Sequence, residues 1–410
     1  MMLPPPGAWI RKSRRLPGFF LLPVLTLPLF GAPGVTVQRG RSDWTVTVRG
    51  SIASPLQQLT LIAGGDITVA GSRTRQIAYS VVEQVSAASE KEARQAALQF
   101  DAAIKSQEGS ASLTFPWVPF CSRQPVRVEI PRGIAKVTVV SLSGNIDVAE
   151  LDGSVVTRNG AGHTTLDHIA GDAEVRTAGG TTTLGLIGGN VHCVSGGGPI
   201  RARTIRGASI FETSGGEIYA AEALGAVRAY TGAGSIRIGH AGSTVTATTQ
   251  GGPIEVGRAA GMVIANNSGG PIRVSSAPGV HCATVSGGIQ LTGVSGSVTA
   301  STTLGDIIAS FLSAAMNPAQ RFGPRNPLDG RLSASSILQT GQGDITVLMP
   351  SNISVTLEAT STGSAGTIIT DFPLRLANRG SVVTAEGLIN GGGPVLQIAA
   401  KGGTITIKRQ

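Results

Sequence analysis

A glycine that recurs every 18 residues through the middle of the chain constrains the fold more than any other feature. A second glycine series falls midway between the members of the first, so each unit consists of two halves of nine residues. The first series is Gly144, Gly162, Gly180, Gly198, Gly216, Gly234, Gly252 and Gly270, and the second is Gly153, Gly171, Gly189, Gly207, Gly225, Gly261 and Gly279. Self-similarity at a fixed period of this length is typical of a solenoid.

Apolar residues alternate with polar ones inside each half. When each half is counted from its glycine as position 0, positions 2 and 4 are mostly apolar, as in Ile236 and Ile238, whereas positions 1 and 3 are mostly polar or proline. Alternation with a period of two is typical of a strand with one buried face. The sequence therefore predicts an all-β solenoid, or β-helix, in which two strands per 18-residue coil face each other across a thin core.

One coil is a residue shorter than the others. Cys193 precedes Ile200 by the same interval as Cys282 precedes Ile289, but the two cysteines are 89 residues apart instead of 90. We expect the missing residue in the turn near Pro278, which makes Val280 and Cys282 the inward pair of the following strand.

The beginning of the chain has the pattern of an export signal, assigned to residues 1–32. Four basic residues between Arg11 and Arg15 precede an apolar run over 16–30 and the small residues Gly31 and Ala32. The run is shorter than the ~20 apolar residues of a membrane span and holds three prolines. We therefore expect an exported protein in the periplasm, on the outer-membrane surface or outside the cell, touching the membrane only where that signal stays uncleaved.

The rest of the chain divides into four expected segments. Residues 41–135 are predicted to form an α+β cap with one helix over 86–105, and the repeats of the solenoid occupy 136–310. An irregular loop is expected over 311–331, where three X-Pro pairs occur, and a terminating region of β-strands over 332–410.

These features resemble the bacterial "putative adhesin" family of β-strand-repeat proteins, a domain of unknown function, and more distantly the head domain of auto-transporter adhesins. The matching pieces are the signal, the Gly65-Asp66-Ile67 segment, the helix, the Val128–Pro131 run that leads into Gly144, and the closing repeat at Gly403. The resemblance implies a β-solenoid at the cell envelope and no catalytic residues. The family often has Asp after the repeat glycine, whereas this chain has varied residues there, among them Asn145, His163 and Pro199.

Several kinds of chemistry are not supported by the residues. Calcium-binding β-rolls carry a carboxylate at every turn, and this array has no recurring Asp, so no metal or other cofactor is expected. The carboxylates of the array form no stacked acid/base pair, and the chain is not expected to be an enzyme. Cys193 and Cys282 point inward about five coils apart, too far for a disulfide or a shared metal. No basic run is interleaved with aromatic residues, so nucleic acid is not an expected partner.

The strongest surface candidate is a row of outward side chains at position 3 of consecutive first halves. It consists of Arg201, Tyr219, Arg237, Glu255 and Arg273, followed by Gln290. Arginine and tyrosine together suit acidic glycans or peptides, whereas Glu255 between two arginines also fits a self-compensated surface. We expect an exported, non-catalytic, adhesin-like scaffold that binds a cell-envelope glycan or protein. The alternatives are a periplasmic structural or assembly partner of an envelope-stress system and, lower, a glycan-processing enzyme.

Overall fold

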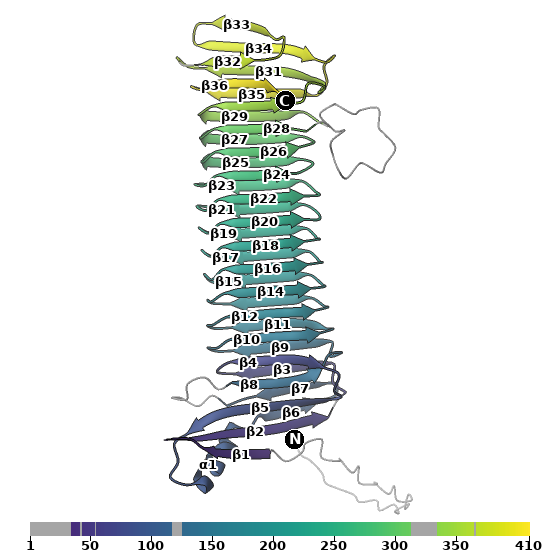
Figure 1. The fold of residues 1–410 in the computed structure, drawn as a ribbon, viewed down its shortest axis with the longest axis vertical. Helices are drawn as coiled ribbons and strands as arrows, with labels where there is room; N and C mark the ends of the chain where they lie inside the picture. The colour runs from purple at the N-terminus through teal and green to yellow at the C-terminus, as the bar shows by residue number, and fades with distance from the viewer. Residues whose placement is uncertain (1–33, 42, 54, 117–124, 313–333, 365) are drawn as a thin grey trace, which may run out of the picture.

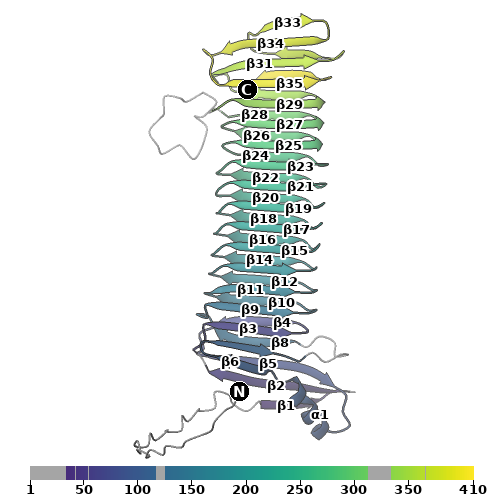
Figure 2. The same ribbon diagram turned by 180° about the vertical axis from the view of Figure 1, so that it is seen from behind.

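The computed structural model describes residues 34–410 except 42, 54, 117–124, 313–333 and 365. The expected signal segment 1–32, residues 313–331 of the expected loop and Cys121 lie outside the described residues. The described chain forms a rod of stacked coils, as Figures 1 and 2 show from opposite sides. The fold is the all-β solenoid that the repeat predicts. The start of the expected loop is wrong, because Phe311 ends a strand and is fully buried.

The coils form two parallel sheets. Sheet A contains the first-half strands β10 (Ile146–Leu151), β12 (Thr164–Ile169), β14 (Thr182–Ile187), β16 (Ile200–Ile205), β18 (Ile218–Ala223), β20 (Ile236–Ala241), β22 (Ile254–Ala259), β24 (Ile272–Ser276), β26 (Ile289–Val294) and β28 (Ile307–Phe311). Sheet B contains the second-half strands β9 (Lys136–Ser141), β11 (Ser154–Asn159), β13 (Ala173–Thr177), β15 (Val191–Ser195), β17 (Ser209–Thr213), β19 (Val227–Thr231), β21 (Val245–Thr249), β23 (Val263–Asn267), β25 (Val280–Ser286) and β27 (Val298–Leu304). Each strand pairs with its equivalent one coil away, so that Ile218 lies beside Ile236.

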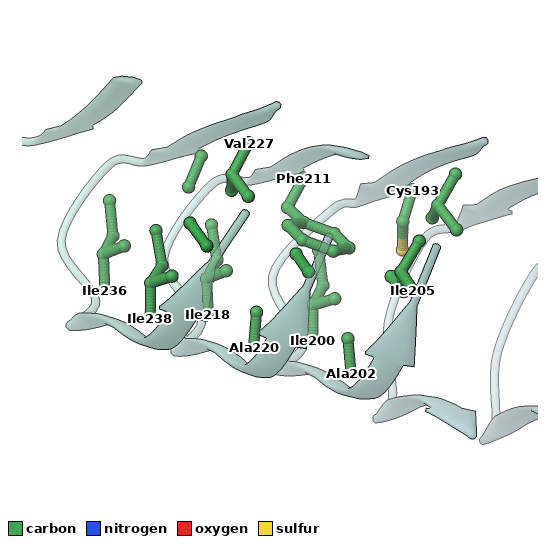
Figure 3. Close-up of a cluster of buried hydrophobic side chains, with 14 of the residues drawn as sticks. Cys193, Ile200, Ala202, Ile205, Phe211, Ile218, Ala220, Val227, Ile236 and Ile238 are labelled. Atoms are coloured by element: carbon green, nitrogen blue, oxygen red, sulfur yellow. The ribbon is translucent and has the colours of Figure 1, made fainter. Parts of the chain in front are cut away.

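The core lies between the two sheets and is made by the predicted inward positions. Ile236 and Ile238 are 0% and 2% exposed, and the shortened coil brings Cys282 beside Ala265 as expected. The core is thin, yet it accommodates the ring of Phe211 from sheet B. Figure 3 shows why, because Ala202 and Ala220 occupy the facing part of sheet A. A large side chain opposite small ones keeps the interior closely packed.

The sequence interpretation missed two further inward positions. Position 7 of the first half is buried in every regular coil, and position 6 of the second half is buried but polar. The first set is Leu151, Ile169, Ile187, Ile205, Ala223, Ala241, Ala259 and Ala277, and the second is Asn159, Thr177, Ser195, Thr213, Thr231, Thr249, Asn267 and Thr284. Both sets recur with the 18-residue period, except that Thr284 follows Asn267 by 17 residues in the shortened coil, so the signal for them was present in the sequence.

The polar inward row holds the glycine turns. The hydroxyl groups of Thr213 and Thr249 and the amide of Asn267 donate to glycine carbonyl oxygens 15 residues earlier, at 2.8–3.1 Å. A Cβ on Gly216 would collide with the backbone of Gly198 in the preceding coil. The glycines are therefore required mainly because the turns stack closely on one another. The buried polar side chains at position 6 then provide hydrogen-bond partners for the carbonyl oxygens of these turns.

The residue after the repeat glycine has a backbone role that explains its variety. The N–H group of Asn145 donates to Asp66 Oδ1 at 2.7 Å, that of His163 to Asn145 Oδ1 at 2.9 Å, and that of Thr181 to His163 Nδ1 at 3.1 Å. The next coil has Pro199 at this place, which has no N–H group to satisfy. The backbone N–H group after the repeat glycine is therefore either bonded to a side-chain acceptor of the preceding coil or removed by a proline, and both solutions fit the stacked turns.

At the N-terminal end, an early pair of strands joins the solenoid out of chain order. β3 (Gln58–Ala63) lies between β7 (Ser110–Thr114) and β9, and β4 (Ile67–Ser72) lies between β8 (Val126–Pro131) and β10. Antiparallel strands then close the sheets. In sheet A, β5 (Gln76–Val85) pairs with β8, β2 (Trp44–Ala53) with β5, and β1 (Gly34–Arg39) with β2, whereas β6 (Ala103–Gln107) pairs with β7 in sheet B.

The single described α-helix is much shorter than predicted. α1 spans Glu90–Ala97, a 3₁₀ turn follows over Leu98–Phe100, and residues 103–105 of the predicted helix belong to β6. The Ser89 hydroxyl accepts the Glu92 N–H and so caps the start of the helix. The chain leaves the helix where Phe100 enters the core, because burial of that ring outweighs helix propensity.

The C-terminal end mirrors this arrangement. β29 (Ser336–Gln342) and β30 (Ile345–Met349) add another coil, and the chain then skips one level to form β31 (Val355–Thr362) and β32 (Thr367–Thr370). After the antiparallel strands β33 (Arg375–Arg379) and β34 (Val382–Ile389), it returns to fill the skipped level with β35 (Val395–Lys401) and β36 (Thr404–Arg409).

Candidate functional site

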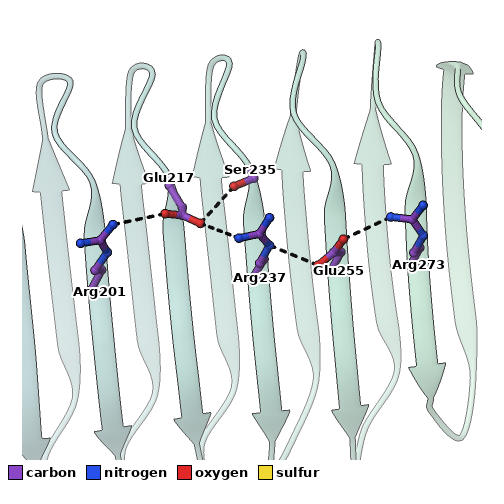
Figure 4. Close-up of polar contacts among 6 residues, drawn as sticks. All are labelled: Arg201, Glu217, Ser235, Arg237, Glu255 and Arg273. Carbon is purple, nitrogen blue, oxygen red and sulfur yellow. Dashed lines mark hydrogen bonds and ion pairs between the residues drawn. The ribbon is translucent and has the colours of Figure 1, made fainter.

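The predicted surface row is assembled in register on the outer face of sheet A. Each member is the direct partner of the next across neighbouring strands, from Arg201 on β16 to Arg273 on β24. Gln290 on β26 continues the row beyond Arg273. We call Arg201, Tyr219, Arg237, Glu255 and Arg273 the position-3 ladder; Figure 4 shows its charged members.

Carboxylates neutralise the centre of the ladder. Glu255 accepts hydrogen bonds from Arg237 Nε and Arg273 Nη1, both at 3.2 Å. Glu217, which precedes β18, accepts one from Arg237 Nη1 at 3.0 Å. Glu217 is not part of the row predicted from the sequence, although a spacing of one coil plus two residues places it beside Arg237. The central arginines therefore fit the self-compensated interpretation.

Two arginines at the β16 end make ion pairs but no close hydrogen bond. Arg201 Nη2 lies 3.6 Å from Glu217, and Arg203 Nη2 lies 3.6 Å from Asp167, so each pair is longer than a hydrogen bond. Within the described part of the chain, neither guanidinium group makes a hydrogen bond. Their side chains are 56% and 63% exposed. Each guanidinium thus presents unused N–H donors to solvent.

These two arginines border an open groove of about 460 Å³ on the face of β12, β14, β16 and β18. Its outward lining residues are Thr165, Asp167, Thr183, Gly185, Arg201, Arg203, Tyr219 and Ala221. Gly185 and Ala221 hollow the surface at position 5, and Asp167 and Arg203 reach toward each other across Gly185. A Cβ on Gly185 would collide with the Asp167 carboxylate. Arg201 and Tyr219 were predicted from the sequence, but the groove was not. It forms because small residues lie beside large ones on adjacent coils.

Asp167 is held at the edge of the groove by backbone N–H groups of its own strand and of the next coil. Its Oδ1 accepts the backbone N–H groups of Leu186 at 2.9 Å and His168 at 3.0 Å. Burial raises the pKa of Asp167, but the Leu186 hydrogen bond, the charge and N–H of His168 and the Arg203 charge together lower it below its usual value. An ionised carboxylate in this position balances part of the positive charge of the groove.

A chain of polar contacts continues from Asp167 through His168 toward the N-terminal end. His168 Nδ1 lies 3.0 Å from Asp167 Oδ2 and 3.7 Å from Glu150, whose carboxylate is 3.0 Å from Arg132. Glu150 and His168 both have positive φ, at 63° and 52°, a conformation that costs energy for residues other than glycine. Both residues lie near the ends of their strands, β10 and β12, and their side chains belong to this exposed network.

The other candidates are not brought together. Cys193 and Cys282 are free thiols inside the core, whereas His192 and His281 lie on the outward side of sheet B. Burial raises the pKa of both thiols to about 12, which is typical of unreactive cysteine. Among the described residues, no group of three or more His, Cys, Asp or Glu side chains could hold a metal ion. In the same part of the chain, no helix has the length and apolarity to cross a membrane.

Comparison with protein-family models and with curated proteins finds no match to the chain. Among solved structures, it is similar to a putative adhesin from Bacteroides fragilis, with 11% identity, 89% of this chain and 97% of that chain covered, and a TM-score of 0.23. A putative adhesin from Parabacteroides merdae is 9% identical, with 88% of this chain and 96% of that chain covered and a TM-score of 0.25. A putative cell adhesion protein from Clostridium sporogenes is 8% identical, with 92% of this chain and 100% of that chain covered and a TM-score of 0.17. The chain thus resembles structures named as adhesins, as its sequence indicated. All three TM-scores are well below 0.5, so these likenesses do not indicate what the chain binds.

Proposed function

We propose that this chain is an exported, non-catalytic, adhesin-like rod that binds a cell-envelope glycan or protein through the outer face of sheet A. The observation that carries the proposal is the position-3 ladder, which runs in register along one face and ends at an open groove. Neighbouring members are about 4.8 Å apart across the sheet. An extended ligand aligned with the rod therefore contacts several of them at once.

The rigidity of the face supports a binding role. Side chains on the strands of a continuous sheet are held more firmly than side chains on loops, so less conformational entropy is lost on binding. Arg237 and Arg273, the compensated arginines of the ladder, retain N–H donors beyond those that bind Glu217 and Glu255. These donors orient the ligand and fix its position along the rod. The unused donors at Arg201 and Arg203 supply the stronger contacts.

The test is a pull-down with the exported chain from two separate preparations, purified envelope glycan and solubilised envelope protein. The test variant replaces Arg201, Tyr219, Arg237 and Arg273 with Ser. We expect a loss of at least about tenfold in binding, and parent binding should weaken with salt because exposed charges are screened. The matched control replaces Arg228 and Tyr230 with Ser, since these outward residues lie on β19 of sheet B.

Each outcome has a distinct meaning. Equal capture by the parent and the ladder variant contradicts a binding role for this face. Capture of protein but not glycan, lost in the ladder variant, assigns the face to a protein partner and favours the periplasmic assembly role. Release of shortened glycan chains during incubation contradicts the non-catalytic assignment.

A further inference from the structure

We propose that the groove over β12 to β18 is a subsite for one sugar unit carrying a single carboxylate, such as a uronic acid residue within a longer chain. Arg201 and Arg203 would bind the carboxylate, and the ring of the sugar would lie against Tyr219. This inference rests on the proposed glycan-binding function and specifies the chemical class of its ligand.

The arginine pair provides the anion site. Arg201 and Arg203 are two residues apart on β16, so both side chains leave the same face of the strand. Arg201 and Arg203 form ion pairs with Glu217 and Asp167 at 3.6 Å, and no hydrogen bond among the described residues occupies their N–H groups. A guanidinium fork matches a carboxylate, and charge-assisted hydrogen bonds are about twice as strong as neutral ones. A ligand carboxylate therefore gains contacts that Glu217 and Asp167 do not make.

The remaining lining suits a sugar ring better than a peptide side chain or a simple anion. Tyr219 is 41% exposed and offers an aromatic face with a polar hydroxyl group. Thr165 and Thr183 place hydroxyl groups on the opposite side, and each can donate or accept a hydrogen bond. The volume of about 460 Å³ lies within the ~300–1,000 Å³ of small-ligand sites.

Asp167 limits the charge of the ligand. Its Oδ1 accepts two backbone N–H groups, and its Oδ2, 3.0 Å from His168 Nδ1, keeps a further lone pair for a sugar hydroxyl. The same negative charge lies beside the arginine pair and repels a second anionic group. The groove thus favours a sugar with one carboxylate over a phosphate or a heavily sulfated unit.

Other parts of the ladder do not offer the same site. Arg237 and Arg273 already donate to Glu217 and Glu255 at 3.0–3.2 Å. Only the β16 end of the ladder combines unused arginine donors with the small residues Gly185 and Ala221 and the ring of Tyr219. This combination is the reason for placing the carboxylate-bearing sugar there.

The experiment uses calorimetric titration with tetragalacturonate as the probe. Its fully methyl-esterified form is the matched neutral probe, because it keeps the sugar rings and removes the negative charge. The parent should bind the acid at least about tenfold more tightly than the ester. Arg201→Gln and Arg203→Gln should each weaken acid binding about tenfold or more, with little change for the ester. Ala221→Leu, which fills the floor without changing charge, should weaken binding of both probes.

Controls and outcomes separate this inference from the proposed function. Arg228→Gln on the opposite sheet should bind the acid as the parent does, and thermal unfolding should show that every variant is folded. If the parent captures envelope glycan but binds acid and ester equally, the carboxylate subsite is wrong and the proposed function stands. Acid binding that survives both arginine changes places the site elsewhere and also overturns the inference. If the parent binds neither probe nor envelope material, both the inference and the proposed function are wrong.

Discussion

Thr231 Oγ1 lies 2.9 Å from the carbonyl oxygen of Gly216, fifteen residues earlier in the chain, and donates a hydrogen bond to it. Thr231 Oγ1 also accepts the backbone N–H of Gly234 in the following coil at 3.2 Å. Because Thr231 is fully buried, water cannot replace either contact. One hydroxyl group thus joins two consecutive turns, and equivalent residues repeat this contact along the rod.

Replacing Thr231 with Val should therefore destabilise the rod although the shape of the side chain is kept. Two backbone groups lose their partner, and we expect a loss of roughly 1–3 kcal/mol in the free energy of unfolding. Urea denaturation measures the change. Thr248→Val is the matched control, because Thr248 is partly exposed on the outward side of β21. Equal effects of the two substitutions would show that the buried hydrogen bonds contribute nothing.

Ile236→Asp should prevent cooperative folding of the repeats. Ile236 is fully buried, and an unpaired carboxylate in a thin apolar core costs several kcal/mol or becomes protonated. Ile236→Ser should be milder but still cost at least about 2 kcal/mol, since it leaves a cavity. Circular dichroism during heating detects both effects, with Thr246→Asp on the outer face as the control. An unchanged melting temperature for Ile236→Asp would refute the inward assignment.

The thiols of Cys193 and Cys282 should be inert in the folded rod. Burial raises the pKa of both to about 12, so almost no thiolate is present at neutral pH, and reagents cannot reach them. In a Cys121→Ser background, a chromogenic disulfide reagent should release no thiol signal until denaturant is added. Reaction of two thiols within minutes in native buffer would contradict this burial.

Asp167 should contribute stability that is lost in acid. Its pKa is lowered in the folded chain, so the contribution is present above the unfolded value of about 3.9 and disappears as the pH falls through the folded value. Asp167→Asn should therefore lower the melting temperature at pH 6 and have a diminishing effect toward pH 2.5. Because the carboxylate is partly exposed, the effect should be modest and smaller in high salt. A difference that grows on acidification would reverse the assigned sign.

How far the sequence predicts the fold depends on how local the determining interactions are. The spacing of Gly216, Gly234 and Gly252 is enough to place each residue beside its equivalent one coil away. The register of the ladder and the shift after Pro278 follow from this rule. The alternation of side chains then decides that Ile236 faces the core. These features repeat, so every coil provides the same evidence for them.

The two ends of the rod do not follow from that evidence. The segment with β3 and β4 was expected to cap the solenoid, yet it forms a level inside it, and β35 returns to a level that β31 had left open. Which free sheet edge accepts a strand depends on the pairing of distant segments and on closure by antiparallel strands. The helix likewise ends early because Phe100 packs into the core, which its local propensity does not reveal.

The candidate site divides in the same way. The repeat by itself determined the all-β solenoid and the row from Arg201 to Arg273, because residues at equal phase must stack. Only the tertiary structure decided that Glu217 hydrogen-bonds with Arg237, while Arg201 and Arg203 make longer ion pairs and keep unused donors beside a groove. The physical reason is that the repeat period decides which residues are neighbours on adjacent strands. Charge pairing and surface hollows depend instead on the size and reach of the side chains that meet across several coils.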